Sequence, residues 1–208
     1  MTLADGIPFV LASSSPARLR ILRNAGIDPE VVVSGIDETT ERGRDPATMV
    51  AVLAERKAAA IAALRPDSLV LGCDSILDFA RAAYGKPESS RDAALLWRRL
   101  SGQQGTLLTG HCLIQPGTGR RVAGLGRTVV RFGTPTEAEL AAYVASGEPA
   151  AMAGGFSLEC LGAPFIDGID GDPSNVIGLS LPLLRRLLGE LGIAINELWR
   201  NPAGSRRS

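Results

Sequence analysis

The fold of this chain is decided by residues 9–22, which read FVLASSSPARLRIL. The apolar run at residues 9–12 predicts a buried strand, and three serines follow it directly. Pro16 stands where the first turn of a helix accepts proline, and the amphipathic helix that it opens ends at Gly26. A strand, a loop of small residues and a helix N-terminus make a cradle for phosphate, because free N–H groups and the positive end of the helix dipole meet there.

Side chains of this loop can add donors to the cradle. We therefore take Ser13, Ser15 and Arg18 as candidate substrate-binding residues. Two alternatives stay open when the segment is considered alone. Ser15 can simply cap the helix, because serine is a common N-cap, and Arg18 can be a solvated surface residue.

Length and composition limit the class of protein. The 208 residues suffice for one large α/β domain or two closely joined lobes, and the 45% hydrophobic content indicates a packed core. The net charge is zero, so nothing favours a nucleic-acid partner or a membrane surface. The chain has neither a run of eighteen apolar residues nor an opening signal peptide, and we therefore expect a cytoplasmic protein.

The cysteines and the histidine argue against several chemistries. Cys73, Cys112 and Cys160 are odd in number and far apart, so they fit neither a disulfide framework nor a zinc site, and we expect free buried thiols. His111 is the only histidine and lies in a strand-like run, where a structural role is the expectation. The aspartates of residues 167–172 resemble a calcium loop only loosely and favour turns.

Strands and helices alternate through the first hundred residues, an order typical of parallel strands joined by crossover helices. The predicted elements are a strand at residues 31–36, a helix at 46–64, a strand at 69–73, a turn at 81–83 and a helix that Ser89 or Ser90 caps and that runs to about residue 100.

The second half begins with a predicted hairpin. Residues 106–115 and 121–132 are strand-like, and a Pro-Gly-Thr-Gly turn separates them. Residues 134–137 have the form of a capping box that opens a helix to about residue 146. A last helix begins near residue 180 and ends at Leu191, with a glycine as its stop.

These elements predict one α/β domain over residues 1–208, with a core at about residues 9–192 and a polar C-terminal tail. The expected fold is a mixed, mostly parallel sheet flanked by helices, because the hairpin adds antiparallel strands to a parallel beginning. Sites in such sheets form at the carboxyl ends of strands. The serine loop, Glu38 and Asp74 each follow a predicted strand, so we expect them to face one cleft.

A phosphate cradle with scattered cations and isolated carboxylates suits hydrolysis of a phosphoanhydride, which needs charge neutralisation, an aligned water and a base. Of the 22 lysine and arginine residues only Lys57 and Lys86 are lysines, and with Arg18 they can neutralise a polyphosphate. Glu38 and Asp74 can bind a hard divalent cation through oxygen, and Asp74 is also the candidate general base.

Each of these side chains has an ordinary explanation when it is taken alone. Asp74 can form a turn after a strand, because aspartate is a common turn residue. Glu38 can be a solvated loop carboxylate, and the two lysines can be surface residues. The pattern therefore gains its meaning only when the motifs are read together.

Taken together, the motifs resemble the Maf family of nucleoside triphosphate pyrophosphatases. The resemblance covers about residues 9–188 in the family's order, and although each motif is short, the ordered set is specific. The matching motifs are LASSSPxR at residues 11–18, DE at 37–38, LAxxKA at 53–58, GxDS at 72–75, GKP at 85–87, LSG at 100–102, TG at 109–110 and GLxL at 178–181.

The resemblance implies cleavage of a nucleoside triphosphate between its α- and β-phosphates, with a divalent cation such as Mg²⁺ or Mn²⁺. The family's proton acceptor falls on Asp74, and its polyphosphate and metal-site residues fall on Ser13, Arg18, Glu38, Lys57 and Lys86. The implied fold is an elongated α/β domain with a cleft between two lobes, often as a homodimer. The implied role is removal of noncanonical or modified nucleotides.

This chain departs from the family's pattern at positions that bear on the base. Ala17 stands where many members have an arginine, Ser75 where members that act on dTTP and UTP have threonine, and Glu159 where those members have glutamine. A carboxylate cannot donate a hydrogen bond as an amide does, so Glu159 is a candidate substrate-binding residue with a different base preference. Residues 171–175 look more like the branch that hydrolyses 7-methyl-GTP, whose positive purine would suit a carboxylate.

Two other functions stay open. A nucleotide-binding regulator of cell division would bind a triphosphate tightly without turning it over. A related inosine triphosphate pyrophosphatase would share the chemistry but prefer ITP or XTP, and the serine-rich first loop argues against it.

Overall fold

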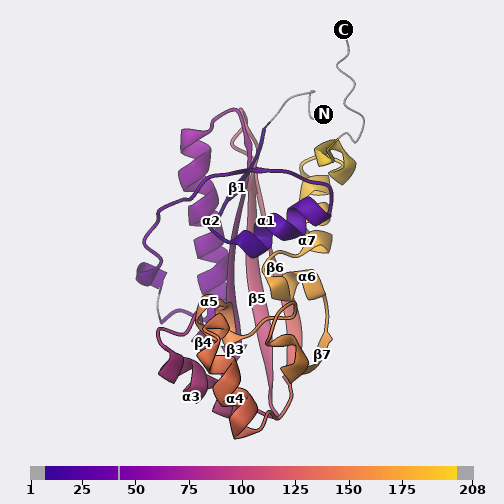
Figure 1. The fold of residues 1–208 in the computed structure, drawn as a ribbon. Coiled ribbons are helices and arrows are strands. Elements are labelled where there is room, and N and C mark those ends of the chain that lie inside the picture. Colours follow the sequence, from indigo (N-terminus) through magenta and orange to yellow (C-terminus); the bar gives the residue numbers. More distant parts are fainter. Residues whose placement is uncertain (1–7, 42, 201–208) are drawn as a thin grey trace.

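The computed structural model describes residues 8–41 and 43–200, so the polar tail predicted at the C-terminus lies outside the described residues from residue 201 onward (Figure 1). The strands are β1 (Phe9–Ala12), β2 (Glu30–Val31), β3 (Leu69–Phe79), β4 (Ala82–Tyr84), β5 (Gln104–Ile114), β6 (Arg121–Phe132) and β7 (Ile166–Asp170). The α-helices are α1 (Pro16–Asn24), α2 (Pro46–Leu64), α3 (Ser90–Leu100), α4 (Glu137–Ala145), α5 (Glu148–Ala151), α6 (Pro173–Ile177) and α7 (Leu181–Glu190). Short 3₁₀ helices lie at Thr39–Glu41, Ala153–Gly155, Ala163–Phe165 and Ile195–Leu198.

The strands of the described residues form one open sheet in the order β2-β1-β3-β5-β6-β7, and β4 pairs with the far end of β3. The predicted mixed α/β sheet is confirmed. Parallel pairing, however, is confined to β1 with β2 and β1 with β3, and the other four pairs are antiparallel. The sheet was expected to be mostly parallel, but most pairs of neighbouring strands are antiparallel. The reason is that β4 folds back on β3 and that β5 continues into β6 through a hairpin.

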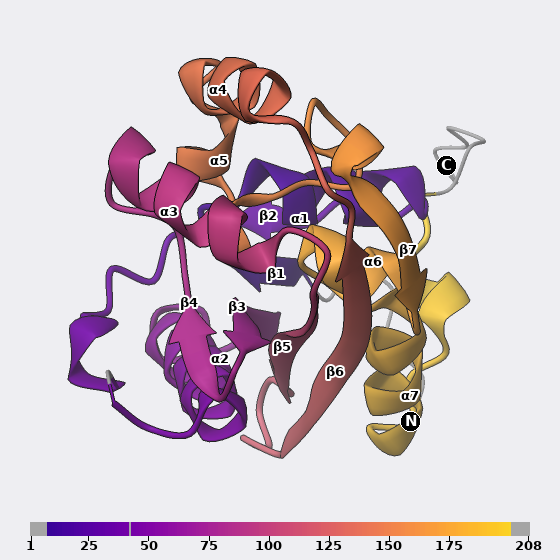
Figure 2. The same ribbon diagram turned by 90° about the horizontal axis from the view of Figure 1, so that it is seen from below.

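Helices cover both faces of the sheet (Figures 1 and 2). The long helix α2 lies on one face, and α1, α6 and α7 lie on the other, while α3, α4 and α5 gather at the end of the sheet where β4 lies. Leu183, Leu187 and their neighbours on α7 pack on the inner residues of β1 and β3. Around α3 and α4 a second core surrounds the fully buried Trp97, whose indole N–H donates to the carbonyl of Gly155 at 2.7 Å.

The backbone of helix α2 lies directly against the sheet at two strand glycines, which leave room for it. A methyl group added at Gly72 on β3 would overlap the carbonyl oxygen of Ala54, and one added at Gly110 on β5 would overlap the carbonyl oxygen of Val50. Both partner atoms belong to the helix backbone, which cannot rotate away as a flexible side chain can. The two glycines therefore set the distance between α2 and the sheet.

Local signals predicted most element starts correctly. Ser15 caps α1 with Pro16 in its first turn, Ser89 caps α3 and Ser180 caps α7. The predicted capping box is displaced by two residues, because Thr136 rather than Thr134 exchanges hydrogen bonds with a glutamate three residues later. The predicted turn at residues 81–83 instead has its tight backbone at residues 80–81, which adopt positive φ.

Two predicted strands have different lengths in the structure. The strand predicted at residues 31–36 ends at Val31, because its partner β1 ends at Ala12 and offers no further edge to pair with. Gly35 in the following loop adopts a left-handed φ of 62°. The strand predicted at residues 69–73 continues to Phe79, because β5 pairs with its other edge from Val70 to Asp78.

The contact between α2 and the sheet gives a stability prediction. We expect Gly72→Ala to lower the free energy of unfolding by about 3 kcal/mol, since the methyl group meets helix backbone on a packed interface. The matched control is Gly189→Ala on the exposed side of α7, where a methyl group meets nothing. The free energy of unfolding of this variant should rise by about 0.5 kcal/mol, because alanine favours the helix more than glycine does. Urea unfolding of the three proteins measures both changes, and equal stability of Gly72→Ala and the unmodified chain would contradict the argument.

Candidate functional site

A cleft of about 700 Å³ opens where the serine loop after β1, the middle of β3 and the loop after α6 come together. Its lining includes every side chain that the sequence predicted for the site: Ser13, Ser15, Arg18, Glu38, Lys57, Asp74, Ser75, Lys86 and Glu159. The expectation that these distant segments converge on one cleft is therefore confirmed. The structure does not test the role of each residue, and those roles stay predictions.

The cleft enters the sheet through a gap beside β3. β1 ends at Ala12, whose partner on β3 is Gly72, and β4 pairs with β3 only from Leu77 onward. Between these points one edge of β3 has no neighbouring strand among the described residues. Asp74 lies in this gap, inside a continuous strand, so the expectation that it follows the end of a strand is wrong.

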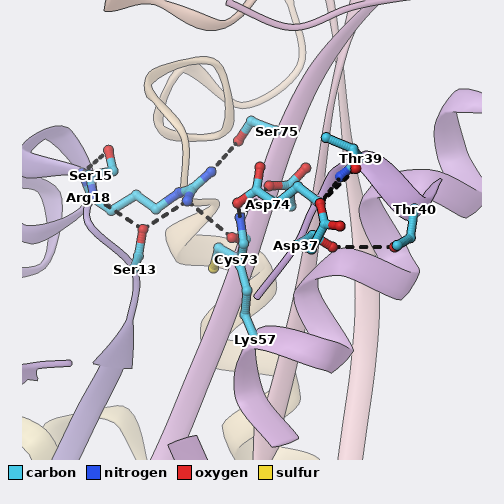
Figure 3. Close-up of polar contacts among 11 residues, drawn as sticks. Ser13, Ser15, Arg18, Asp37, Thr39, Thr40, Lys57, Cys73, Asp74 and Ser75 are labelled. Carbon is cyan, nitrogen blue, oxygen red and sulfur yellow. Dashed lines mark hydrogen bonds and ion pairs between the residues drawn. The ribbon is translucent and has the colours of Figure 1, made fainter. Parts of the chain in front are cut away.

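Consecutive residues of β3 direct their side chains to opposite faces of the sheet. Asp74 points to the face that α2 covers, where Lys57 donates a hydrogen bond to it (Figure 3). Ser75 points to the other face, where Arg18 donates a hydrogen bond to it. The gap beside β3 exposes both faces to the same cleft. One short piece of strand therefore presents two different groups of charged side chains to a bound molecule.

Arg18 of α1 is buried, and its guanidinium is held by four oxygens from three segments, of which Ser13, Cys73 and Ser75 are drawn in Figure 3. The Nε–H donates to the carbonyl of Gly178 at 2.8 Å. Nη1 donates to Ser13 Oγ at 2.9 Å and to the carbonyl of Cys73 at 3.0 Å, and Nη2 donates to Ser75 Oγ at 2.9 Å. Four of the five N–H groups thus have partners, and one on Nη2 is left for a ligand.

All of the oxygens that hold Arg18 are neutral. No carboxylate lies within ion-pair distance of its guanidinium in the described ranges 8–41 and 43–200. The Asp74 carboxylate is near enough to feel the charge of Arg18, but it makes no ion pair with it. A buried cation without a direct ion-pair partner attracts an anion strongly, because the surroundings screen its field poorly. The guanidinium therefore favours binding of a negatively charged ligand in the cleft.

The serine loop provides further donors beside Arg18. The hydroxyl oxygen of Ser13 accepts from the N–H of Ser15 at 3.2 Å as well as from Arg18, so its own hydrogen remains available. Ser15 Oγ accepts from the N–H of Arg18 at 3.5 Å as the N-cap of α1, and its hydrogen is likewise available. Both functions proposed for Ser15, as a cap and as a donor, are thus compatible.

Lys57 of α2 joins the two carboxylates of the site. Its Nζ lies 2.6 Å from Asp74 Oδ1 and 2.7 Å from Glu38 Oε1. Lys57 and Asp74 are buried, whereas the Glu38 side chain is 54% exposed. Burial raises the pKa of the Asp74 carboxyl, and the charge and hydrogen bond of Lys57 counteract part of this rise. No described residue donates to Asp74 Oδ2, which leaves this oxygen available to a water molecule in the cleft.

Glu38 reaches the site from a loop and not from a strand end, which corrects the sequence prediction. The preceding strand stops at Val31, and the chain then runs along the cleft wall. Asp37 Oδ1 accepts from the N–H of Thr39 at 2.9 Å and from its hydroxyl at 2.7 Å, and this turn fixes the loop next to Glu38 (Figure 3).

The outer part of the cleft carries Lys86 and Glu159. Lys86 is exposed on the loop after β4 and has no ion-pair partner among the described residues. The Glu159 carboxylate forms an ion pair with Arg20 on α1, and both side chains are partly exposed. Apolar side chains, among them Met49 and Leu158, also line the cleft and suit a planar base.

Sequence reasoning missed two contributors to the site. The carbonyl of Gly178 holds Arg18, although the two residues are 160 positions apart. Thr109 on β5 contacts Ser75, and the sequence had singled it out only as part of a two-residue motif. The contact at Gly178 uses a main-chain carbonyl, which every residue has, so the pattern of side chains cannot predict it. The contact between Thr109 and Ser75 depends on the register of two strands, which the sequence did not predict.

The residues of the cleft fit a divalent cation shared with a substrate. The described residues contain no cluster of three or more histidine, cysteine or acidic side chains arranged for a metal. Glu38 and Asp74, however, bring two carboxylates to the same ammonium group of Lys57. Mg²⁺ commonly takes one or two protein carboxylates and completes its shell with substrate phosphates and water, so this donor set is sufficient.

Comparisons with known proteins agree with this geometry. A family model described as "Maf-like protein" matches residues 8–191. A nucleoside triphosphate pyrophosphatase of Streptomyces coelicolor is 56% identical over 194 residues, which span 92% of this chain and 94% of that protein. Proteins of the same name from Saccharopolyspora erythraea and Nocardia farcinica are 50% and 48% identical, over 93% and 94% of this chain and 98% of each relative.

The mixed sheet, the serine loop and the charged cleft define an α/β protein built to hold an anion beside two carboxylates. With the family match over nearly its whole length, the chain belongs to the Maf family. None of the helices within residues 8–41 and 43–200 is both long and apolar enough to cross a membrane.

The cysteines are free thiols, as predicted, but only two are buried. Burial raises the pKa of the Cys73 thiol to about 12 and that of Cys112 to about 11, so both are inert at neutral pH. Cys160 is exposed on the cleft wall, which corrects the expectation that all three are buried. Its loop lies at the surface, so no core is available to cover it.

His111 has the structural role that its position in a strand predicted. Its Nε2 accepts from the N–H of Ser180 at 2.9 Å, and its Nδ1 lies 3.0 Å from the carbonyl of Thr109. The ring is therefore neutral with its hydrogen on Nδ1, since a carbonyl can only accept. Burial lowers the pKa of His111 to about 4.

The buried histidine predicts a loss of stability in mild acid. Between pH 6.5 and 4 the unfolded chain binds a proton at His111 that the folded chain does not, so the free energy of unfolding falls as the pH falls. We expect His111 to contribute about 2 kcal/mol to this loss between pH 8 and pH 5. Urea unfolding at both pH values measures it, with His111→Gln as the non-titrating comparison. Equal pH dependence of the two proteins would refute the assignment.

Proposed function

We propose that this chain is a nucleoside triphosphate pyrophosphatase that cleaves the bond between the α- and β-phosphates and releases the monophosphate and pyrophosphate. The relatives carry the name of this activity. The observation that carries the proposal is that one cleft holds both an open carboxylate oxygen on Asp74 and the buried guanidinium of Arg18, which makes no ion pair with a described residue. This combination suits attack of water on a bound polyphosphate.

The polyphosphate binds at the N-terminus of α1. Arg18 supplies charge and its remaining N–H, and Ser13 and Ser15 supply hydroxyl hydrogens. Lys86 lines the same cleft and neutralises charge on the leaving pyrophosphate. Binding of this kind holds the scissile bond in place, and positioning together with charge neutralisation accounts for most of the catalysis of phosphoryl transfer.

Asp74 accepts the proton of the attacking water on Oδ2. The water oxygen bonds to phosphorus, the bridging oxygen leaves with the pyrophosphate, and the proton passes to the carboxylate, so atoms and charge balance. Lys57 holds the other oxygen of Asp74 at 2.6 Å and fixes its orientation. The raised pKa of Asp74 makes it a stronger base than an ordinary aspartate.

Glu38 and Asp74 are the residues that would hold a divalent cation such as Mg²⁺ or Mn²⁺. When bound, such an ion neutralises charge that develops on the phosphate oxygens. Lys57 keeps both carboxylates together before substrate arrives, which limits their mutual repulsion.

Glu159 recognises the base in this proposal. It lines the same cleft as the apolar side chains, and Arg20 holds its carboxylate. A carboxylate accepts hydrogen bonds from a purine edge and attracts a positively charged base, so 7-methyl-GTP and related modified purine nucleotides are the proposed substrates. The enzyme would then remove modified nucleotides before polymerases use them.

The setting that we propose is the cytoplasm, with a homodimer as the assembled form. Three free cysteines without a disulfide among the described residues suit a reducing compartment. The zero net charge gives no reason to expect nucleic acid or a membrane as a partner.

A triphosphate panel tests the function. Pyrophosphate release should require Mg²⁺ or Mn²⁺, stop with EDTA and fall by about 10² to 10⁴-fold in Asp74→Asn, which keeps the shape but loses the base. Asp78→Asn on the same strand, outside the cleft, is the matched control and should retain full activity. Tight triphosphate binding without turnover across the panel would instead favour a nucleotide-binding regulator of cell division.

Glu159→Gln tests the choice of base. The ratio of kcat/KM for 7-methyl-GTP to that for UTP should fall by about tenfold, because the amide carries no charge and donates where the carboxylate accepts. Glu55→Gln removes a similarly exposed glutamate that pairs with Arg121 outside the cleft, and it should leave the ratio unchanged. An unaltered ratio in Glu159→Gln would remove Glu159 from base recognition.

A further inference from the structure

Thr109 lies on β5 directly opposite Ser75 of β3. Its side chain is fully buried, and it is absent from the lining of the cleft. The Thr109 hydroxyl donates to the carbonyl of Asn175 at 3.1 Å, and its oxygen lies 3.0 Å from Ser75 Oγ. Thr109 is therefore in contact with a cleft residue without reaching the cleft itself.

The direction of the hydrogen bonds around Thr109 follows from counting hydrogens. The only hydroxyl hydrogen of Thr109 is used by the Asn175 carbonyl, which can only accept. The hydrogen between Thr109 and Ser75 must then come from Ser75. Since Arg18 Nη2 can only donate, Ser75 Oγ accepts from it at 2.9 Å. The result is one chain of donors that runs from Arg18 through Ser75 and Thr109 to Asn175.

We propose that Thr109 is a positioning residue for the phosphate-binding guanidinium of Arg18. By taking the hydrogen of Ser75, it keeps a lone pair of Ser75 Oγ directed at Nη2. Without this acceptor the Ser75 hydroxyl can rotate its hydrogen toward the guanidinium or toward bound phosphate. The inference rests on the proposed function, because it assigns Arg18 to polyphosphate binding.

The arrangement also changes the part that Ser75 plays. Its hydrogen is committed to Thr109, so Ser75 holds Arg18 and does not donate to phosphate while the chain of hydrogen bonds is intact. The remaining oxygens on the guanidinium come from Ser13, Cys73 and Gly178. Ser75 is the one that holds Nη2, the nitrogen with the free N–H group.

Thr109→Val tests the proposal, because valine keeps the shape and removes the acceptor. We expect KM for the triphosphate and the dissociation constant for inorganic tripolyphosphate to rise by about tenfold with little change in kcat. Thr109→Ser keeps the hydroxyl and should restore both values. A merely structural role would lower the active fraction, and hence the apparent kcat, without moving KM.

Thr128→Val is the matched control. Thr128 is a buried threonine on β6 whose hydroxyl oxygen accepts from the side-chain amide of Asn175 at 3.2 Å, whereas Thr109 donates to the main-chain carbonyl of the same residue. Thr128 also donates to the Asp172 carbonyl at 2.9 Å, and no hydrogen bond joins it to Ser75 among the described residues. Its loss should lower stability while KM and tripolyphosphate binding stay unchanged. A rise of KM in Thr128→Val equal to that in Thr109→Val would overturn the proposal.

A double-mutant cycle with Arg18→Gln shows whether Thr109 acts through Arg18. Arg18→Gln with Thr109→Val should bind tripolyphosphate no more weakly than Arg18→Gln alone, and additive losses would overturn the proposal. Tripolyphosphate binding is measured without turnover, so it tests the role of Thr109 independently of the proposed pyrophosphatase activity. A chain that binds tripolyphosphate in a Thr109-dependent way but releases no pyrophosphate would refute the proposed function and support this inference. A chain that releases pyrophosphate but shows no tripolyphosphate binding that depends on Thr109 would refute this inference and leave the proposed function standing.

Discussion

The site depends on the backbone contact between helix α2 and the sheet. Gly72 and Gly110 carry no side chain on the face that α2 covers, so the helix backbone lies directly on β3 and β5. Lys57 and Asp74 project from these two surfaces in contact, and the Lys57 ammonium lies 2.6 Å from the Asp74 carboxylate. Two positions that have no polar chemistry of their own therefore bring the charged side chains of the helix and the sheet together.

A second constraint is the place where β1 stops. The chain leaves the sheet at Ala12 to form the serine loop and α1, and it thereby uncovers the edge of β3 at Asp74 and Ser75. The same turn that ends the strand supplies Ser13 and carries Arg18 back over the gap. The phosphate cradle and the opening in the sheet are thus two results of one chain reversal.

Buried charges of this kind are costly unless a ligand is present. Moving Arg18 and the Lys57–Asp74 pair out of water opposes folding. The hydrogen bonds from Arg18 to neutral oxygens recover only part of the hydration free energy that is lost. Such an arrangement is understandable when a polyphosphate supplies the missing negative charge. The apolar cores around α7 and Trp97 stabilise the fold and offset the free energy that is lost when these charges are buried.

The sequence by itself determined the local structure and the kinds of chemistry available. Serine before proline set the start of α1, alternating and apolar runs set the strands, and the residue types limited the site to oxygen acceptors and nitrogen donors. The tertiary structure alone decided that Asp74 lies inside a strand, that Glu38 arrives from a loop and that Thr109 faces Ser75. Those facts depend on strand register and on contacts between residues up to 160 positions apart, and local patterns do not encode either.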